Sequence, residues 1–165
     1  MKEVKKDSIK QSLKGHWIWG MMWFVILLAV DMITKIWANA YFSNPKNPEV
    51  IKLIPGYLEL CITYNRGISF SMGSDASVPA KIALVAATGV MFVAFAIYYF
   101  KMDKRRTWVR YAIVFIVAGG VGNLIDRVYY QVWEPYSLSD PSTWDGVRDM
   151  VRLKIFFMDF GVCNL

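Results

Sequence analysis

Three long apolar stretches constrain this chain more than any other feature of its sequence. They cover residues 17–38, 82–100 and 108–126. A helix that crosses the hydrocarbon core of a bilayer needs about 20 mostly apolar residues, a length that each stretch approaches or exceeds. Hydrophobic residues make up 56% of the 165-residue chain, against about 45–50% in soluble domains. The sequence therefore predicts a single-domain, all-α integral membrane helical bundle and argues against a soluble globular fold.

The charged residues outside these stretches predict how the chain is oriented in the membrane. Lysine and arginine are concentrated in residues 1–16 and in the short connection 101–107. Because cytoplasmic loops of membrane proteins carry an excess of Lys and Arg, we expect both segments in the cytoplasm. Residues 39–81 and 127–165 would then lie on the external side. This clustering explains the net charge of +6 without a nucleic-acid partner, and none is expected.

The two external segments carry signals for turns and for a little β-structure. Residues 50–54 and 57–63 are short β-branched or alternating runs around a Pro-Gly pair, which predicts a small β-hairpin on the outer membrane face. Asn65 and Gly67 follow, and they predict a tight turn whose side-chain amide is available to a ligand. A plain turn without a ligand is the alternative. Residues 131–146 are rich in Ser, Pro and Asp and are expected to form a loop.

The few histidine and cysteine residues exclude several kinds of chemistry. His16 is the single histidine, and the two cysteines, Cys61 and Cys163, lie far apart in the sequence. This excludes a disulfide scaffold, a Cys/His zinc site and a triad that uses a second histidine. We expect no metal and no cofactor, and we expect both cysteines to serve in packing.

An acidic residue at the end of the third stretch is the strongest candidate for function. In the segment GGVGNLIDR, Asp126 shares one helix face with Asn123, Gly122 and Gly119. A carboxyl group at the membrane edge is costly and is a functional candidate by default. The two glycines would leave room for a substrate backbone to approach the helix. A helix–helix contact of small residues is the alternative, but it explains the glycines and not the acid.

A second charged pair lies at a similar depth in the first stretch. Asp31 and Lys35 are four residues apart on one helix face, and they predict either an internal ion pair or part of the same site as Asp126. Without a metal or histidine pair, the remaining chemistry is acid/base catalysis by two close carboxyl groups that share a proton. The candidates for the second carboxyl group are Asp31, Asp149 and Asp159.

Four motifs, in this order, resemble those of the bacterial lipoprotein signal peptidases, also called signal peptidase II. DMITK at residues 31–35 is similar to the family's D-Q-x-x-K, and YNRGISF at 64–70 is similar to N-x-G-x-x-F. GGVGNLIDR at 119–127 matches G-G-x-x-N-x-x-D-R, and VRDMV at 147–151 is similar to V-x-D-F-I. The order of the motifs, combined with the predicted spans, makes the resemblance specific.

The resemblance implies a four-helix aspartyl endopeptidase of the bacterial cytoplasmic (inner) membrane, with its N-terminus in the cytoplasm and its active site at the outer leaflet. Such an enzyme removes signal peptides from diacylglyceryl-modified prolipoproteins by cutting before the lipidated cysteine. The resemblance implies that Asp126 is catalytic and that Asp31 and Lys35 support the site. The residues expected to bind substrate are Asn65, Gly67, Asn123, Arg127 and Asn164. We expect a monomer whose partners are the prolipoprotein substrates and membrane lipids.

The end of the chain departs from the family pattern. The family's second catalytic aspartate stands in F-N-x-A-D, and a fourth helix follows it. Here the sequence reads Cys163-Asn164-Leu165 and stops, so we expect a C-terminally truncated form of a longer protein, inactive if it is complete. A non-catalytic helper subunit of a membrane complex is the main alternative. A transporter with Asp126 as a proton relay is less favoured, because no inverted repeat or pair of interrupted helices is evident.

Overall fold

The computed structural model describes residues 2–67, 76–103, 105–130, 132, 146–155 and 158–163. This part of the chain forms three helices and one four-stranded sheet. The helices are α1 (Lys2–Phe42), α2 (Val78–Lys101) and α3 (Thr107–Tyr129). The strands are β1 (Ile51–Ile54), β2 (Leu58–Asn65), β3 (Val147–Ile155) and β4 (Met158–Cys163).

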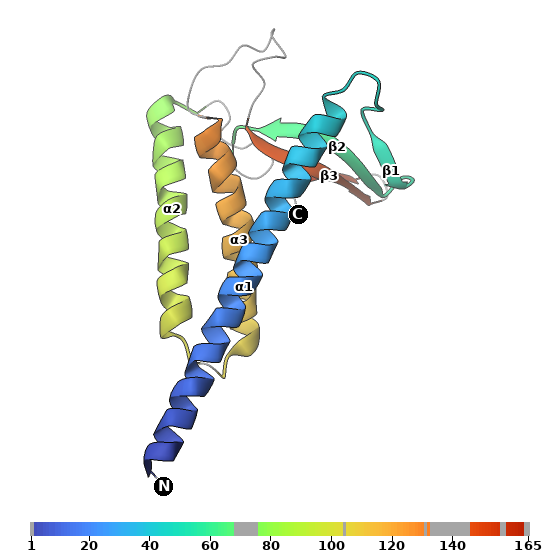
Figure 1. Cartoon of the computed structure of the whole chain (residues 1–165). Helices are drawn as coiled ribbons and strands as arrows, with labels where there is room; N and C mark the ends of the chain where they lie inside the picture. Colours follow the sequence, from blue (N-terminus) through green and yellow to red (C-terminus); the bar gives the residue numbers. More distant parts are fainter. Residues whose placement is uncertain are drawn as a thin grey trace.

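The three helices form the membrane-spanning bundle that the sequence predicts. Helices α2 and α3 run side by side, and α1 crosses them obliquely (Figure 1). Their candidate spans are 26 residues (Trp17–Phe42), 24 residues (α2) and 23 residues (α3) long. At about 1.5 Å per residue, each is longer than the hydrocarbon core of about 30 Å. Large apolar side chains on their outer faces are exposed, as expected for a multi-pass membrane protein whose lipid-facing surface is hydrophobic.

Each helix extends beyond the apolar stretch that predicted it. Helix α1 already begins at Lys2, within the expected tail 1–16, whereas α2 and α3 are longer by a few residues. Helix α1 continues from residue 38 to Phe42, and the rings of Trp37 and Tyr41 stack at 5.4 Å across this extra turn. Such pairs four residues apart stabilise a helix. Pro45 follows shortly afterwards, and its ring disfavours a helical conformation of the residue before it. The expected boundaries were narrower because they followed hydrophobicity, whereas the helices also include polar residues of the membrane interface.

The antiparallel sheet has the strand order β1-β2-β3-β4. Its first two strands confirm the predicted hairpin, with Gly56 at φ +80° in the turn. Strands β3 and β4 were not anticipated in the sequence. The first half of β3 is buried on both faces, including Arg148 and Asp149, so its hydrophobic pattern does not alternate as it would in a strand with one exposed face.

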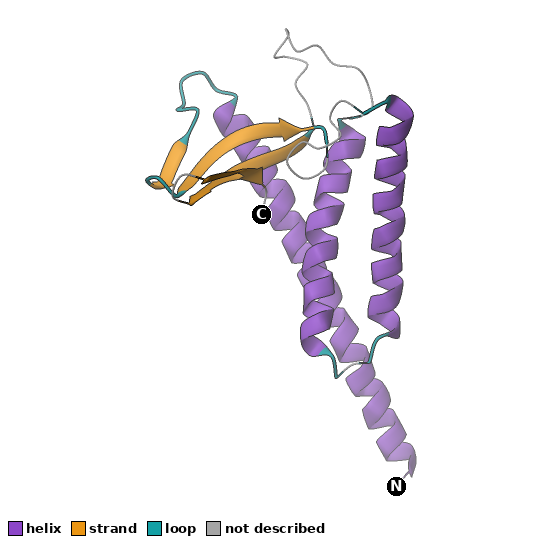
Figure 2. Ribbon diagram, turned by 180° about the vertical axis from the view of Figure 1, so that it is seen from behind, coloured by secondary structure: helices purple, strands orange, loops and turns teal. Residues whose placement is uncertain are grey.

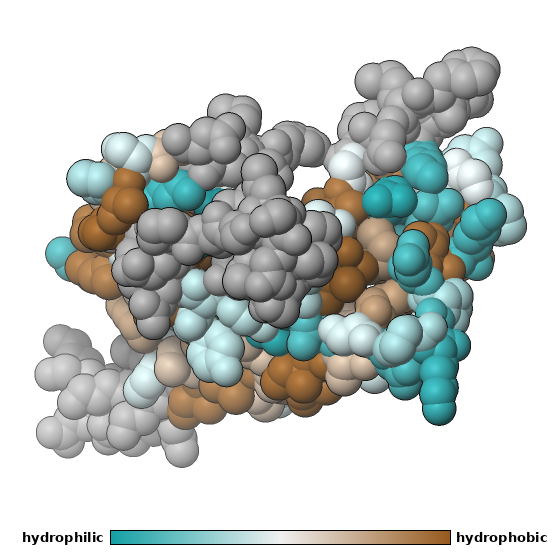
Figure 3. Space-filling model, turned by 90° about the horizontal axis from the view of Figure 1, so that it is seen from above, coloured by the Kyte–Doolittle hydropathy of each residue, from teal (hydrophilic) through white to brown (hydrophobic). Residues whose placement is uncertain are grey.

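The sheet lies over the ends of α1 and α3 (Figures 1 and 2). Polar contacts attach it there, among them one to each of these helices. The Tyr64 hydroxyl of β2 donates to Asn39 Oδ1 of α1, and the Arg148 backbone N–H of β3 donates to Asp126 Oδ2 of α3. Seen from the sheet end, hydrophilic residues gather on the sheet side and hydrophobic residues line the flanks of the helices (Figure 3). At the opposite end, α2 and α3 meet in an apolar core around Tyr99 and Val114.

Candidate active site

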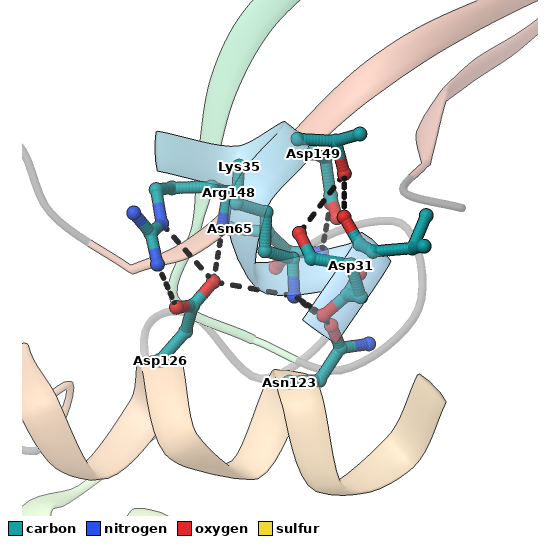
Figure 4. A network of polar contacts seen from close by, with 9 residues as sticks. Asp31, Lys35, Asn65, Asn123, Asp126, Arg148 and Asp149 are labelled. Atoms are coloured by element: carbon teal, nitrogen blue, oxygen red, sulfur yellow. Dashed lines mark hydrogen bonds and ion pairs between the residues drawn. The ribbon is translucent and has the colours of Figure 1, made fainter. Parts of the chain in front are cut away.

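A cluster of charged and amide side chains is buried where α1 and α3 meet β2 and β3 (Figure 4). Its two most enclosed members, Lys35 and Asp126, are both 0% exposed. Buried charges are tolerated in proteins when they are paired and hydrogen-bonded. The charged members of this cluster therefore need ion-pair and hydrogen-bond partners. It comprises Asp31, Lys35, Asn65, Asn123, Asp126, Arg127, Arg148 and Asp149.

Lys35 joins the two membrane helices. Its Nζ lies 2.9 Å from Asp31 Oδ2 on α1 and donates to Asn123 Oδ1 on α3, also at 2.9 Å. The same ammonium group lies 3.4 Å from Asp126 Oδ2. The pair on α1 thus forms the predicted internal ion pair and also belongs to the cluster around Asp126. Its depth in the first span matches that of Asp126, as the sequence indicated.

The carboxylate of Asp126 is enclosed by cationic and N–H donors. The Arg148 guanidinium donates to Oδ1 at 2.6 Å through Nη2 and to Oδ2 at 3.4 Å through Nε. The Arg148 backbone N–H also donates to Oδ2, at 3.1 Å. Together with Lys35, these contacts place two cationic groups against the carboxylate and fasten β3 to α3. A proton donor or acceptor in catalysis needs an accessible oxygen, and each oxygen of Asp126 already accepts at least one of these contacts.

Asp149 is the neighbouring acid, and its surroundings are different. It is 7% exposed, and its Oδ2 accepts a hydrogen bond of 3.2 Å from the neutral amide of Asn65. Burial raises the pKa of Asp149 to about 6, while the Asn65 hydrogen bond and the charges of Lys35 and Arg127 partly oppose this effect. A buried carboxyl group that titrates near neutral pH is typical of catalytic acids and bases.

The predicted turn at Asn65 and Gly67 organises this side of the cluster. Asn65 Oδ1 accepts the Gly67 N–H at 2.9 Å, while Asn65 Nδ2 donates to Asp149. Gly67 O in turn accepts a 2.8 Å hydrogen bond from Arg127 Nη2. The Asn65 side-chain oxygen therefore closes the turn, as the alternative of a plain turn expects. The side-chain nitrogen instead donates to Asp149. The turn connects Arg127 at the end of α3 to the carboxyl group on β3.

The glycines of α3 allow the helices to approach closely. A Cβ atom at Gly122 would overlap Asp31 Oδ2, and one at Gly120 would overlap Phe92 Cζ. The expectation that Gly122 leaves room for a substrate backbone is therefore wrong, because α1 places the Asp31 carboxylate there. The alternative of a helix–helix contact of small residues is correct for this glycine.

The structure brings together seven of the predicted site residues, all except Asn164, which lies outside the described residues. It adds Arg148, which the sequence reasoning did not single out although it precedes Asp149 in the VRDMV motif. Asp159 belongs to β4, but its side chain is outside the described part, as is most of the expected loop 131–146. Among the described residues, no group of three or more His, Cys, Asp or Glu side chains is arranged to hold a metal ion.

Comparisons with known proteins agree on one family. The family model of signal peptidase (SPase) II matches residues 23–165. The lipoprotein signal peptidase of Streptococcus pyogenes serotype M6 is 30% identical over 142 residues, which are 86% of this chain and 78% of that protein. The enzyme of the same name from Bifidobacterium longum strain DJO10A is 41% identical over 104 residues, 62% of this chain and 52% of that protein.

A solved structure described as a bacterial membrane enzyme has the same fold, with a TM-score of 0.63 at 22% identity. The match covers 88% of this chain and 76% of that structure. The three membrane-crossing helices with an antiparallel sheet at one end are the fold of that enzyme, and the family model places the chain among the membrane peptidases. The chain belongs to the signal peptidase II family.

Proposed function

We propose that this protein is an aspartic endopeptidase of the bacterial cytoplasmic membrane that removes signal peptides from diacylglyceryl-modified prolipoproteins, cutting before the lipidated cysteine. Membership of the signal peptidase II family supports a peptidase, and the names of the relatives support lipoprotein precursors as substrates. The buried carboxylate cluster at the membrane edge supports acid/base hydrolysis at the level where a lipid-anchored peptide would be held.

Asp149 is our candidate for the acid/base group, in preference to Asp126. This choice rests on the difference between the surroundings of the two carboxyl groups within one cluster. Asp126 is held by Arg148 and Lys35, whereas Asp149 is bound by a neutral amide and has a pKa of about 6. In this proposal Asp149 removes a proton from the attacking water, while Asp126, Lys35 and Arg148 position β3 against α3.

An aspartyl mechanism needs a second carboxyl group to protonate the substrate. The resemblance places it in the F-N-x-A-D segment, which begins at Cys163 in this numbering. The sheet supports this assignment, because Cys163 lies opposite Val151 and β4 runs antiparallel to β3. Within β4 the chain therefore runs along β3 in the direction of Asp149. Asn164 belongs to this segment and is proposed to bind substrate, as are Asn65, Gly67, Asn123 and Arg127.

In the proposed topology, the basic N-terminus and the connection between α2 and α3 are cytoplasmic, and the sheet and the cluster lie at the outer leaflet. The substrate's acyl chains would remain in the lipid while its peptide lies below the sheet. This topology can be tested with single cysteines introduced at exposed positions, Arg105 on one side and Lys52 on the other, in a background without the native cysteines. A membrane-impermeant maleimide added to intact cells should label only the position near Lys52.

The proposed activity is tested in a bacterium depleted of its own lipoprotein signal peptidase and supplied with the gene, including any sequence beyond codon 165. Processing of a diacylglyceryl-modified precursor should be restored, and Asp149→Asn should lower the rate by about 10²–10⁴-fold without loss of the inserted protein. Glu59→Gln is the matched control, since Glu59 is a buried carboxylate of the same sheet that pairs with Lys154 and Arg152.

Three outcomes would contradict parts of the proposal. Normal processing by Asp149→Asn would remove Asp149 from the mechanism. Loss of processing in Asp126→Asn with unchanged thermal stability would return the catalytic role to Asp126. Failure of the intact gene to restore processing, together with a co-purifying complex, would favour the helper subunit.

A further inference from the structure

The end of the bundle opposite the sheet contains a buried cation that the proposed activity does not use. Arg110 lies in the first turn of α3 and is 8% exposed. Its guanidinium carbon lies 4.3 Å from the centroid of the Tyr99 ring, a cation–π contact. Within the described residues, none of the ion pairs includes Arg110. A buried charge without a counter-ion is costly, so this position calls for an anion.

A cavity of about 250 Å³ lies beside Arg110. Arg110 lines it together with the hydroxyl-bearing side chains of Thr107, Tyr99 and Tyr111 and with Trp19, and no carboxylate lines it. It also touches the start of α3, where the N-cap residue Arg106 makes no side-chain cap. The first N–H groups of a helix carry partial positive charge and bind anions such as phosphate. The cavity therefore combines a buried guanidinium, three hydroxyl-bearing side chains and a helix N-terminus without a side-chain cap.

A second cavity, of about 310 Å³, lies next to the first. The two share Gly20, Tyr99 and Val114, and the second extends past Phe24 and Val117 with otherwise apolar lining. Val114 and Val117 lie about one and two turns beyond Arg110 on α3, so this cavity runs from the basic end toward the middle of the membrane. The two cavities together present a polar end near the membrane surface and an apolar end at acyl-chain depth.

We propose that this composite cavity binds an anionic phospholipid of the cytoplasmic leaflet. The phosphate group lies at Arg110 and the start of α3, and an acyl chain occupies the apolar part beside Val117. Basic pockets between membrane helices on the cytoplasmic side are suited to such headgroups. Exposed Lys101 and Arg106 at the same end add positive charge near the pocket. The site lies at the far end of the bundle from Asp149, and the inference does not depend on the peptidase activity.

The test is native mass spectrometry of the purified full chain in detergent. The probes are phosphatidylglycerol and phosphatidylcholine with identical acyl chains. Both lipids carry the phosphate, but only phosphatidylcholine adds a cationic choline beside Arg110, Lys101 and Arg106. The wild-type protein should therefore retain phosphatidylglycerol about tenfold more than phosphatidylcholine. Arg110→Gln should abolish this preference. Arg105→Gln removes an exposed charge at the same end that lines neither cavity, and it should retain the wild-type preference.

A cavity-filling variant and a competition with inorganic phosphate distinguish a bound lipid from a bound free anion. Val117→Trp fills the apolar cavity and keeps Arg110, so it should lower lipid retention about as much as Arg110→Gln; it also decides the case if Arg110→Gln does not fold. Excess inorganic phosphate should leave the bound lipid in place. Displacement by phosphate would identify the ligand as a free anion and overturn the lipid assignment. A folded Arg110→Gln or Val117→Trp variant with unchanged retention would overturn the proposal.

Discussion

Asp126 and Asp149 belong to one buried cluster, but they lie on two sides of it and have different direct partners. On the ion-paired side, Arg148 and Lys35 surround Asp126. On the amide side, Asn65 alone among the described residues donates a hydrogen bond to Asp149. The alternation of a strand explains the division, because the adjacent residues Arg148 and Asp149 point to opposite faces of β3. Arg148 therefore neutralises the carboxylate of α3 and not its own neighbour.

This difference suggests a division of roles within the cluster. A paired carboxylate between a helix and a strand fixes the geometry, because removing either charge leaves the other buried and uncompensated. A carboxyl group that burial holds near pKa 6 can exchange a proton at the pH where the enzyme works. The ion-paired side should therefore control stability, and the amide side should control activity.

The largest loss of stability is expected from breaking the Arg148–Asp126 pair. Arg148→Met should destabilise the folded protein by about 3–5 kcal/mol, because it leaves Asp126 buried with one counter-ion fewer. The double variant Arg148→Met, Asp126→Leu should recover most of this loss, since an apolar pair can replace a buried ion pair with little net change. Thermal unfolding in detergent measures both. A single variant as stable as the wild type would show that the pair does not fix β3 to α3.

Replacement of Asp149 is expected to change stability less, and to raise it instead of lowering it. Its pKa is raised from 3.8 to about 6, so the folded state favours the protonated form. This preference is fully present below pH 4 and is lost as the pH rises through about 6. Above that pH, Asp149→Asn should be more stable than the wild type by up to about 3 kcal/mol, and below pH 4 the two should be equal. Unfolding midpoints measured from pH 4 to pH 8 provide the test.

The sequence was sufficient to predict much of this arrangement. Hydrophobic stretches located the three helices, because the bilayer imposes their length and composition. The spacing of Asp31 and Lys35 indicated both their pairing and their depth. The roles of the two aspartates could not be separated in the same way. They depend on the face of β3 from which Arg148 projects, and β3 itself was missed because its first half is buried on both faces and so lacks an alternating pattern.

The smallest change in stability that distinguishes the ion-paired side from the amide side is expected at Gly122. A methyl group there would overlap the Asp31 carboxylate at Oδ2 and would displace the acid that pairs with Lys35. Gly122→Ala should therefore destabilise the protein by about 1–3 kcal/mol, the usual range for overpacking. Thermal unfolding in detergent measures this loss.

Gly89→Ala is the matched control in α2. Its new methyl group would lie 3.8 Å from Leu124 Cδ2, an ordinary contact, and alanine favours a helix by about 1 kcal/mol over glycine. Gly89→Ala should therefore leave stability unchanged or raise it. If Gly122→Ala lowers stability while the pKa of Asp149, read from the pH dependence of cleavage, stays near 6, the ion-paired side acts independently of the amide side. A shift in that pKa would instead show that Lys35, whose charge acts on both aspartates, couples the two.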